Sequence, residues 1–499
     1  MIAVRTGLAA GSTGWFLDLF AGAGGFSLGL SAAGFRCFGV VERDARCAET
    51  HAKNFPDHAQ APLSRLGPDL GDITRLSEQE VRRVVEASGS PEIDIVAGGP
   101  PCQGFSRVGR GKLDSLARRR GAFRNDPRNQ LYRRYLDLLA WTRPRGFIFE
   151  NVPGILRVRG ENFAEQVCLD AEDLGYVVRC AVLNSAWYGV PQTRERVIIL
   201  GFREDLDLVP EFPEPRYSVP ERRGARASTG LRTAPFRHPR HFVEIEPRAG
   251  LPRAVTVHEA IRDLPPVPAR GPDASKFAAR ILPIPVKYRP GRPTKFSSRM
   301  RNWCSTVPAM WVRDHACRHN PRDYRIFARM RPNDCYPRAV EIAEELFADA
   351  KARSGHHVER SEFVPPYSLF GFEEKWKMLD PESPSWTVTA HLSKDCYSHI
   401  HYDGGQARTI TIREAARLQS FPDHFQFCGG MGDQFRQIGN AIPPLLALAI
   451  AQRMKSTLAR AASTTAPSSW GSARIRRGVV SSARSRTEWR LAVGNYRVR

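Results

Sequence analysis

Several features common in other classes of protein are missing from this sequence. It has no run of about 18 apolar residues, so no membrane span is expected. Its start, MIAVRTGLAAGSTGW, is too short and too interrupted for a secretory signal peptide. Its ten cysteines form no CxxC pair and no regular framework, which favours reduced thiols in a cytoplasm. No internal repeat is visible. With 499 residues, the chain is long enough for two or three globular domains.

Acidic residues are scarce relative to basic ones. The chain has 74 Lys and Arg against 52 Asp and Glu, which gives a formal net charge of +22. A surface this positive attracts polyanions, of which nucleic acid is the commonest. The alternative is that a GC-rich genome favours arginine codons for no functional reason.

Short apolar runs alternate with helical stretches over the first 200 residues, a pattern typical of a doubly wound α/β sheet. The expected strands are 15–20, 37–41, 93–97, 147–150, 177–183 and 197–202. The connection between the last two, through Tyr188-Gly189-Val190-Pro191, leaves no room for a crossover helix. We therefore expect these two strands to form an antiparallel hairpin.

The character of the sequence changes after residue 204. Residues 204–300 are rich in Pro and Arg, and a mixed region up to 385 contains a helical pattern at 339–352. Ordered sequence returns at Trp386, and the last strong helix is expected at 444–458. The basic, Ser/Arg-rich end of the chain is expected to be disordered on its own, either as an arm that touches nucleic acid or as a dispensable tail.

Two signals at the first strand ends predict a nucleoside site. Phe20-Ala-Gly-Ala-Gly-Gly-Phe26 follows the first strand and precedes a helix expected at 27–35. Glu42 ends the next strand, twenty residues after Gly22, where a carboxylate can accept both hydroxyls of a ribose. These two features are compatible with NAD, FAD and S-adenosylmethionine and do not distinguish between them.

Two further strand ends carry reactive groups. Cys102 follows the third strand on a rigid corner, Gly98-Gly-Pro-Pro-Cys102, and Glu150 closes the fourth. Ligands of an open α/β sheet gather at the carboxyl ends of its strands, so the nucleoside site, the thiol and the carboxyl should face one cleft. Hydride transfer has no obvious use for this thiol. A thiol nucleophile beside an acid suits covalent activation of an electron-poor ring.

These motifs resemble those of bacterial-type DNA (cytosine-5)-methyltransferases. The matching blocks are FLDLFAGAGGFSLGL, VVERD, GDIT, GGPPCQGFS, FENV, YGVPQTRER, TITIREAARLQSFPD and QIGNAIPP, and they cover roughly residues 15–203 and 386–455. The resemblance implies a Rossmann-like methyltransferase sheet with a smaller DNA-recognition domain. It implies a catalytic domain at 14–203 that is completed by 437–460, a target-recognition domain at 204–436, with readout mainly in 204–385, and a basic tail at 461–499.

The resemblance also implies a mechanism. The Cys102 thiolate would add to C6 of a cytosine flipped out of the duplex, while Glu150 acts on N3. C5 would then take the methyl group of S-adenosylmethionine, and loss of the C5 proton and of the thiolate would restore the ring. Arg194 and Arg196, expected on one face of a β-edge, would hold the base and support the catalytic loop, and residues 106–131 would close as a lid.

The remaining site residues follow from the same resemblance. Phe20 would stack on adenine, Glu42 would bind the ribose, and Asn440, on a turn before the last helix, would brace the methionine end. The other residues implied at the cofactor are Gly22, Gly24, Asp72, Ile73 and Pro101, and those implied at the substrate are Gln103, Ser106, Asn151, Val152 and Gln192. One departure is visible: where many relatives carry an aromatic residue after the ribose-binding acid, this chain has Arg43.

The expected partner is double-stranded DNA, bound by a monomer in a bacterial cytoplasm and nucleoid, with a cognate restriction endonuclease as genetic partner. Two alternatives stay open: a tRNA cytosine-5 methyltransferase, and a catalytically inactive DNA-binding relative. No metal is expected. The sets His315-x-Cys317-x-His319 and His391, Cys396, His399 and His401 do not have the spacing of a structural zinc site.

Overall fold

The computed structural model describes residues 14–66, 71–89, 92–101, 131–157, 161–219, 236–267, 285–305, 307–318, 320–354, 357–368, 375–394 and 397–464. Cys102, Gln103 and Ser106, nearly all of the expected lid, and the tail beyond 464 lie outside these ranges. No helix within the described ranges is long and apolar enough to cross a membrane. Eight of the ten cysteines lie within them, and all eight are free thiols.

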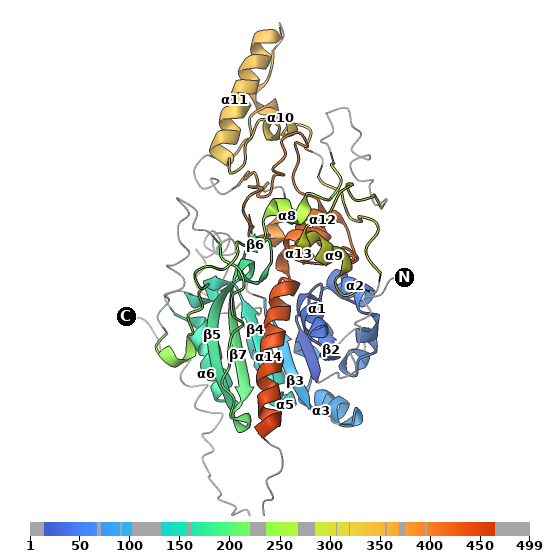
Figure 1. Cartoon of the computed structure of the whole chain (residues 1–499), viewed down its shortest axis with the longest axis vertical. Coiled ribbons are helices and arrows are strands. Elements are labelled where there is room, and N and C mark those ends of the chain that lie inside the picture. The colour runs from blue at the N-terminus through green and yellow to red at the C-terminus, as the bar shows by residue number, and fades with distance from the viewer. Residues whose placement is uncertain are drawn as a thin grey trace, which may run out of the picture. The chain divides into compact units, whose positions relative to one another are not determined.

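A six-stranded sheet forms the centre of the N-terminal half, in the order β2-β1-β3-β4-β7-β5 (Figure 1). Its strands are β1 (Trp15–Leu19), β2 (Arg36–Val41), β3 (Ile93–Gly98), β4 (Gly146–Asn151), β5 (Tyr176–Asn184) and β7 (Glu195–Arg203). Strands β2, β1, β3 and β4 pair in parallel, whereas β7 runs antiparallel to both β4 and β5. The six strands and the antiparallel hairpin predicted from the sequence are confirmed.

The carboxyl ends of the parallel strands are level with one another. Leu19 pairs with both Val41 and Gly98, and Gly98 pairs with Phe149. The chain passes from β1 to β2 on one side and reaches β3 on the other, so the strand order switches direction at β1. Ligands of open α/β sheets bind at such a switch point. The segments that follow β1, β2, β3 and β4 therefore start along one edge.

The sheet is covered on both faces, which explains its nearly continuous apolar strands. Side chains alternate between two apolar clusters: Phe147 and Phe149 of β4 belong to one, and Ile148 belongs to the other. Helices α3 (Glu78–Ala87), α5 (Leu131–Thr142) and α6 (Phe163–Glu172) contribute to the first cluster. Helices α1 (Gly25–Ala32) and α14 (Pro444–Thr464) contribute to the second. The result is a helix–sheet–helix arrangement.

Two of these helices differ in extent from the sequence prediction. Helix α1 covers 25–32 instead of 27–35, and α14 continues six residues beyond Leu458. The two helices pack closely. A Cβ added to Gly25 would lie 2.3 Å from the carbonyl oxygen of Ile442, and one added to Gly29 would lie 2.5 Å from Cβ of Ala447. Glycine is required at both positions because another chain segment occupies the space of a side chain.

The chain after β7 builds two further apolar clusters. Helices α8 (Val257–Ile261), α9 (Lys295–Asn302), α12 (Ile412–Leu418) and α13 (Met431–Asn440) share the first, which also contains Leu28 and Phe55. Helices α10 (Tyr324–Phe327) and α11 (Tyr336–Arg353) share the second with Trp376. The helix predicted at 339–352 is confirmed and begins three residues earlier. The domain boundaries themselves stay a prediction.

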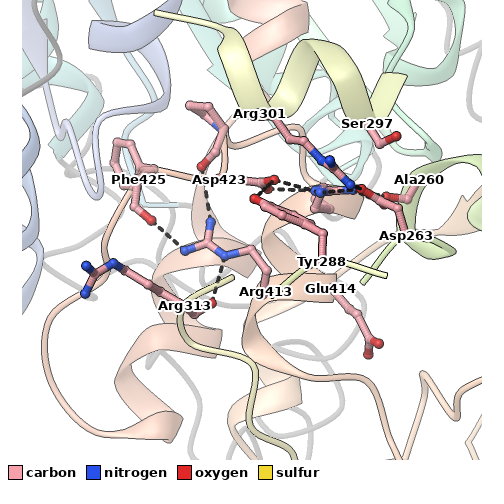
Figure 2. Close-up of polar contacts among 12 residues, drawn as sticks. Ala260, Asp263, Tyr288, Ser297, Arg301, Arg313, Arg413, Glu414, Asp423 and Phe425 are labelled. Carbon is pink, nitrogen blue, oxygen red and sulfur yellow. Dashed lines mark hydrogen bonds and ion pairs between the residues drawn. The ribbon is translucent and has the colours of Figure 1, made fainter. Parts of the chain in front are cut away.

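Buried arginines on α12 connect distant segments of this part of the chain. Arg417 donates to Asp263 at 2.7 Å and to Asp423 at 2.6 Å, and its side chain is 0% exposed. Figure 2 shows Arg413 donating to the carbonyl oxygens of Arg313 and Phe425. Burial alone would raise the pKa of Asp423, but the guanidinium of Arg417 holds it below its ordinary value. These charges therefore compensate one another inside the protein.

Replacement of Arg417 by Ala should lower the free energy of unfolding by about 3–5 kcal/mol, because two buried carboxylates lose their shared cation. The matched control is Arg436→Ala, which breaks a half-exposed pair with Asp44 (2.9 Å) and should cost at most about 1 kcal/mol. Urea unfolding followed by tryptophan fluorescence and circular dichroism measures both. Equal effects of the two substitutions would contradict this account.

Candidate active site

The turn between β1 and α1 leaves open space beside the backbone. Phe20 and Gly22 have φ values of 58° and 56°, and Gly24 has 96°, all in the left-handed region. A Cβ added to Gly22 would meet nothing within 4 Å, whereas one added to Gly24 would lie 2.6 Å from the ring of Phe55. Gly22 therefore borders an open space, whereas Gly24, which has no side chain, allows the turn to pack closely against the ring of Phe55. A left-handed conformation at a residue such as Phe20 is uncommon and is often found at functional sites.

Glu42 connects the end of β2 to this turn. Its Oε2 accepts from the backbone N–H of Gly22 at 2.8 Å, and its Oε1 accepts from the N–H of Asp44 at 2.6 Å. Burial raises the pKa of the carboxyl, and the two N–H donors partly oppose that rise. Each oxygen retains capacity for a further hydrogen bond, as a diol ligand requires.

Asp72 and Arg43 lie together next to this acid. Asp72 accepts from the N–H of Thr74 at 3.0 Å and so begins the short helix Ile73–Arg75. The guanidinium Nη1 of Arg43 lies 3.7 Å from Asp72 Oδ2, and the Arg43 side chain is 77% exposed. At the position directly after Glu42, this chain therefore has a cation paired with Asp72, one of the residues implied at the cofactor.

A buried network of hydrogen-bonded polar side chains, which the sequence analysis did not identify, supports the turn between β1 and α1. Asp18, in the middle of β1 and 0% exposed, accepts at Oδ2 from Ser27 N–H (3.0 Å) and Ser27 O–H (2.7 Å). His51 Nε2 lies 2.9 Å from the same hydroxyl. Burial raises the pKa of Asp18 to about 7, and the bonds from Ser27 limit the rise. The signal in the sequence was an acid inside the apolar strand FLDLF.

Glu150, at the end of β4, faces Arg196 of β7. Arg196 Nε lies 2.8 Å from Glu150 Oε1, and both side chains are largely buried. A Cβ added to Gly99 would lie 2.7 Å from Glu150 Oε2, so only glycine lets the loop after β3 approach the carboxyl this closely. Cys102 itself lies outside the described residues, but the backbone that leads to it starts beside Glu150.

Asn151 also holds the loop after β3 in place. Its Nδ2 donates to the carbonyl oxygen of Pro100 at 3.2 Å, and its Oδ1 accepts from the N–H of Val152 at 2.9 Å. Half-buried Pro101 is the last described residue before the gap, and half-buried Val152 begins the turn after β4. The ends of β3 and β4 are therefore held together by this side chain.

Arg194 lies between the short strand β6 (Gln192–Thr193) and β7, outside the regular β-edge on which the sequence placed it together with Arg196. Its side chain is among the fully buried ones, and its guanidinium donates to the carbonyl oxygens of Val388 (2.6 Å), Gly439 (2.8 Å) and Ala441 (3.1 Å). The guanidinium of Arg196 goes instead to Glu150. The alternation of side chains is interrupted because Arg194 belongs to neither strand. Its role at the base stays a prediction.

Gln192 and Asn440 also differ from expectation. Gln192 is 0% exposed, donates to the carbonyl oxygen of Leu418 at 3.0 Å and accepts from the N–H of Val388 at 2.8 Å. These contacts indicate a bracing role, and its predicted contact with substrate has no support in them. Asn440 is the exposed last residue of α13, not a turn residue, and its neighbours are fixed by Arg194.

The histidines considered as zinc ligands have other partners. The two ring nitrogens of His315 lie 3.0 Å from Thr411 Oγ1 and 2.7 Å from the carbonyl oxygen of Pro265. His401 Nδ1 accepts from the N–H of Asp403 at 3.1 Å. His319 and Cys396 lie outside the described residues.

Comparisons with known proteins agree with this geometry. The profile of the family described as "C-5 cytosine-specific DNA methylase" matches residues 15–268 and 332–456. Over 453 residues the chain is 35% identical to "Putative type II methyltransferase M.OihORF3336P" of Oceanobacillus iheyensis, covering 89% of this chain and 95% of the other. Over 462 residues it is 31% identical to the type II methyltransferase M.AgeI of Thalassovita gelatinovora, covering 88% and 98%.

The fold is also similar to the crystal structure of a protein encoded within an E. coli prophage, with a TM-score of 0.58, 23% identity, and coverage of 90% of this chain and all of the other. This likeness shows that the two proteins share a mostly parallel α/β fold. The chain belongs to the C-5 cytosine-specific DNA methylase family, as its motifs predicted.

Replacement of Asp18 by Asn should change how stability depends on pH. The folded-state pKa of about 7 lies above the ordinary value of 3.8, so the wild-type carboxyl contributes stability at low pH and loses it as the pH rises through 7. Relative to Asp18→Asn, the wild type should lose about 2–3 kcal/mol between about pH 5 and about pH 8. Denaturant unfolding at a series of pH values measures this difference. A constant difference would show that the carboxyl does not titrate in this range.

Proposed function

We propose that the protein transfers the methyl group of S-adenosylmethionine to C5 of a cytosine within a specific sequence of double-stranded DNA. The observation that carries the proposal is the Glu150–Arg196 pair (2.8 Å) beside Gly99. Glu150, held by Arg196, lies at the start of the Pro-Pro-Cys loop, on the sheet edge that also holds the glycine turn and Glu42. An acid in this position suits the activation of a pyrimidine next to a nucleoside cofactor.

The residues of the glycine turn fit this cofactor. The open space at Gly22 admits a ligand against the backbone, and Glu42 is held by two N–H donors with acceptor capacity left for ribose hydroxyls. Phe20, Asp72 and Ile73 would hold the adenine, while Gly24, Pro101 and Asn440 would border the rest of the molecule. S-Adenosylmethionine, when bound, supplies an electrophilic methyl group.

The chain's own residues would prepare the cytosine. The Cys102 thiolate adds to C6, and the electron pair of the C5–C6 double bond moves to C5 as Glu150 acts on N3 by hydrogen bonding or protonation. After C5 gains the methyl group, a base takes the C5 proton, the thiolate leaves and the double bond returns. Arg196 would hold Glu150 in place for this step, a positioning effect.

Features of the chain between 285 and 313 support DNA binding by the predicted target-recognition domain. Met310 is 67% exposed and Trp311 is 46% exposed, and Lys287 Nζ lies 5.7 Å from the centre of the Trp311 ring. Exposed aromatic and apolar side chains beside cations suit contact with bases and phosphates. Gln103, Ser106, Asn151, Val152 and Gln192 remain the proposed contacts or supports at the flipped base.

The names of the relatives support a place in a type II restriction–modification system, with an endonuclease that cuts the same sequence as genetic partner. A monomer acting on DNA in the bacterial cytoplasm and nucleoid is the proposed form. The two alternatives, methylation of tRNA and DNA binding without catalysis, make different predictions for the product.

Bisulfite sequencing of DNA and RNA from cells that express the protein tests the proposed function. New 5-methylcytosine should occur at one DNA sequence, and Cys102→Ser should abolish it while S-adenosylmethionine binding, measured by calorimetry, persists. Methylation restricted to RNA would favour the tRNA alternative. Absence of new 5-methylcytosine in both, from a protein that binds DNA, would favour the inactive relative.

Replacement of Glu150 by Gln should lower kcat by about 10²–10⁴-fold, because the acid acts on the ring in the transition state. Arg196→Gln should lower kcat in the same direction, with the affinity for S-adenosylmethionine unchanged, because the guanidinium acts through Glu150. The control is Arg203→Gln on the same strand, whose partners are Glu92 (2.9 Å) and Asp205 (2.6 Å). A tritiated-methyl assay should show near-normal kcat for this control. If Arg196→Gln matches the control, Arg196 does not position the acid.

A further inference from the structure

Two histidines and two glutamates meet on the outer side of the sheet edge formed by β5. His241 ends the short turn Pro239–His241, His238 is the residue directly before this turn, and Glu165 and Glu172 lie on α6. One ligand atom from each of Glu165, His238 and His241 lies within 4.8 Å of the other two. No other such group of three occurs among the described residues.

The backbone explains why both imidazoles reach α6. The N–H of His241 donates to the carbonyl oxygen of His238 at 3.1 Å, which closes a tight turn with Pro239 at its start. The centres of the two rings lie 5.6 Å apart. The next residues continue along β5, where the N–H of Val243 donates to Cys180 at 2.8 Å. The turn is thus anchored to the edge strand and carries both rings on one side.

His241 is held in the orientation of a metal ligand. Its side chain is 0% exposed, and its Nε2 lies 2.9 Å from Glu172 Oε1. A carboxylate at Nε2 fixes the proton there, so Nδ1 presents a lone pair. That Nδ1 is buried and has no hydrogen-bond partner. Histidines that bind metals commonly donate their other N–H to a carboxylate in this way.

Glu165 supplies the negative charge. Its Oε1 accepts from the backbone N–H of His238 at 2.7 Å and lies 3.0 Å from His238 Nδ1. Two ligands of a tetrahedral zinc ion lie roughly 3.3 Å apart when each bond is about 2.0–2.1 Å. The 3.0 Å between Glu165 Oε1 and His238 Nδ1 is close to this value, and a ligand atom of His241 lies within 4.8 Å of both residues' ligand atoms.

We propose that Glu165, His238 and His241 bind a divalent cation of the zinc class, with Glu172 as the positioning residue of His241. Two imidazole nitrogens and one carboxylate oxygen suit Zn²⁺ better than Mg²⁺ or Ca²⁺, which prefer oxygen ligands. His238 is 41% exposed, so a water molecule can complete the coordination and the ion has an entry path.

The location indicates a structural role for the cation, which would hold two segments of the chain together. The segment around Phe242 covers β5, an edge strand whose free hydrogen-bonding groups would otherwise be open to pairing with other chains. A cation at Glu165, His238 and His241 would join this cover to α6. None of the three residues touches Glu150, Arg196 or the glycine turn in the described contacts, so the site is independent of the methyl-transfer chemistry.

Metal titration of the untagged full-length chain tests the proposal. The metal-free protein is titrated with ZnCl₂ by calorimetry, with CoCl₂ by visible absorption, and with MgCl₂ as a comparison. Zn²⁺ and Co²⁺ should bind at one site, Zn²⁺ should raise Tm by several degrees at saturation, and Mg²⁺ should do neither. The Co²⁺ spectrum should show tetrahedral bands without a thiolate charge-transfer band, since the ligands are nitrogen and oxygen.

Substitutions test whether the metal binds at this site or at other groups of the chain. His241→Gln and Glu165→Gln should remove the site, whereas Glu172→Gln should weaken binding by about 10–100-fold. The matched control is His424→Gln: His424 is also buried with both ring nitrogens unbonded, but it belongs to no such cluster among the described residues. This control should bind Zn²⁺ normally. Equal binding by wild type and His241→Gln, or a thiolate band with Co²⁺, would overturn the proposal and leave only two histidine–glutamate hydrogen bonds.

Discussion

The buried guanidinium of Arg194 joins the end of the N-terminal half of the chain to C-terminal segments that complete the fold. It binds carbonyl oxygens of Val388, Gly439 and Ala441, which are 194, 245 and 247 residues away along the chain. A Cβ on Gly439 would lie 2.2 Å from the backbone nitrogen of Ala390, so these segments are in direct contact. Without this cation, several buried carbonyl oxygens would lose their donor, at a cost of about 1–3 kcal/mol for each. The end of α13, which carries Asn440, and the segment that leads into α14 would lose their support.

The sequence was most informative where the cause of a structure is local. Six apolar runs predicted the six strands, and the short Tyr188–Pro191 connection predicted the antiparallel hairpin, because chain length alone forbids a crossover there. It was least informative for polar side chains whose partners lie far along the chain. Arg194 and Gln192 were expected at the substrate, yet both are buried against segments around 388 and 418. Nothing near them in the sequence identifies those partners.

Several arginines of this basic chain are buried and do not reach its surface. Arg194, Arg408, Arg413 and Arg417 are among the largest fully buried side chains. Arg408 pairs with Glu414 and Arg417 with Asp263 and Asp423, so these cations are compensated inside the protein. They add little to the field that a polyanion meets at the surface. Each of these buried cations is counted together with its acidic partners, so the pairs do not account for the net charge of +22, and the surplus that attracts a polyanion belongs to the rest of the chain.

The contact of α14 with the sheet has a consequence for biosynthesis. Leu446, Ile450 and Met454 cover a face of the sheet that contains Phe16 and Ile148. The covering residues are translated about 300 positions after Ile148, which at roughly 5–20 residues per second is a delay on the order of 15–60 s. During that time the nascent chain exposes an apolar sheet face on the ribosome. A chain that terminates anywhere before α14 would keep this face open and be prone to aggregation.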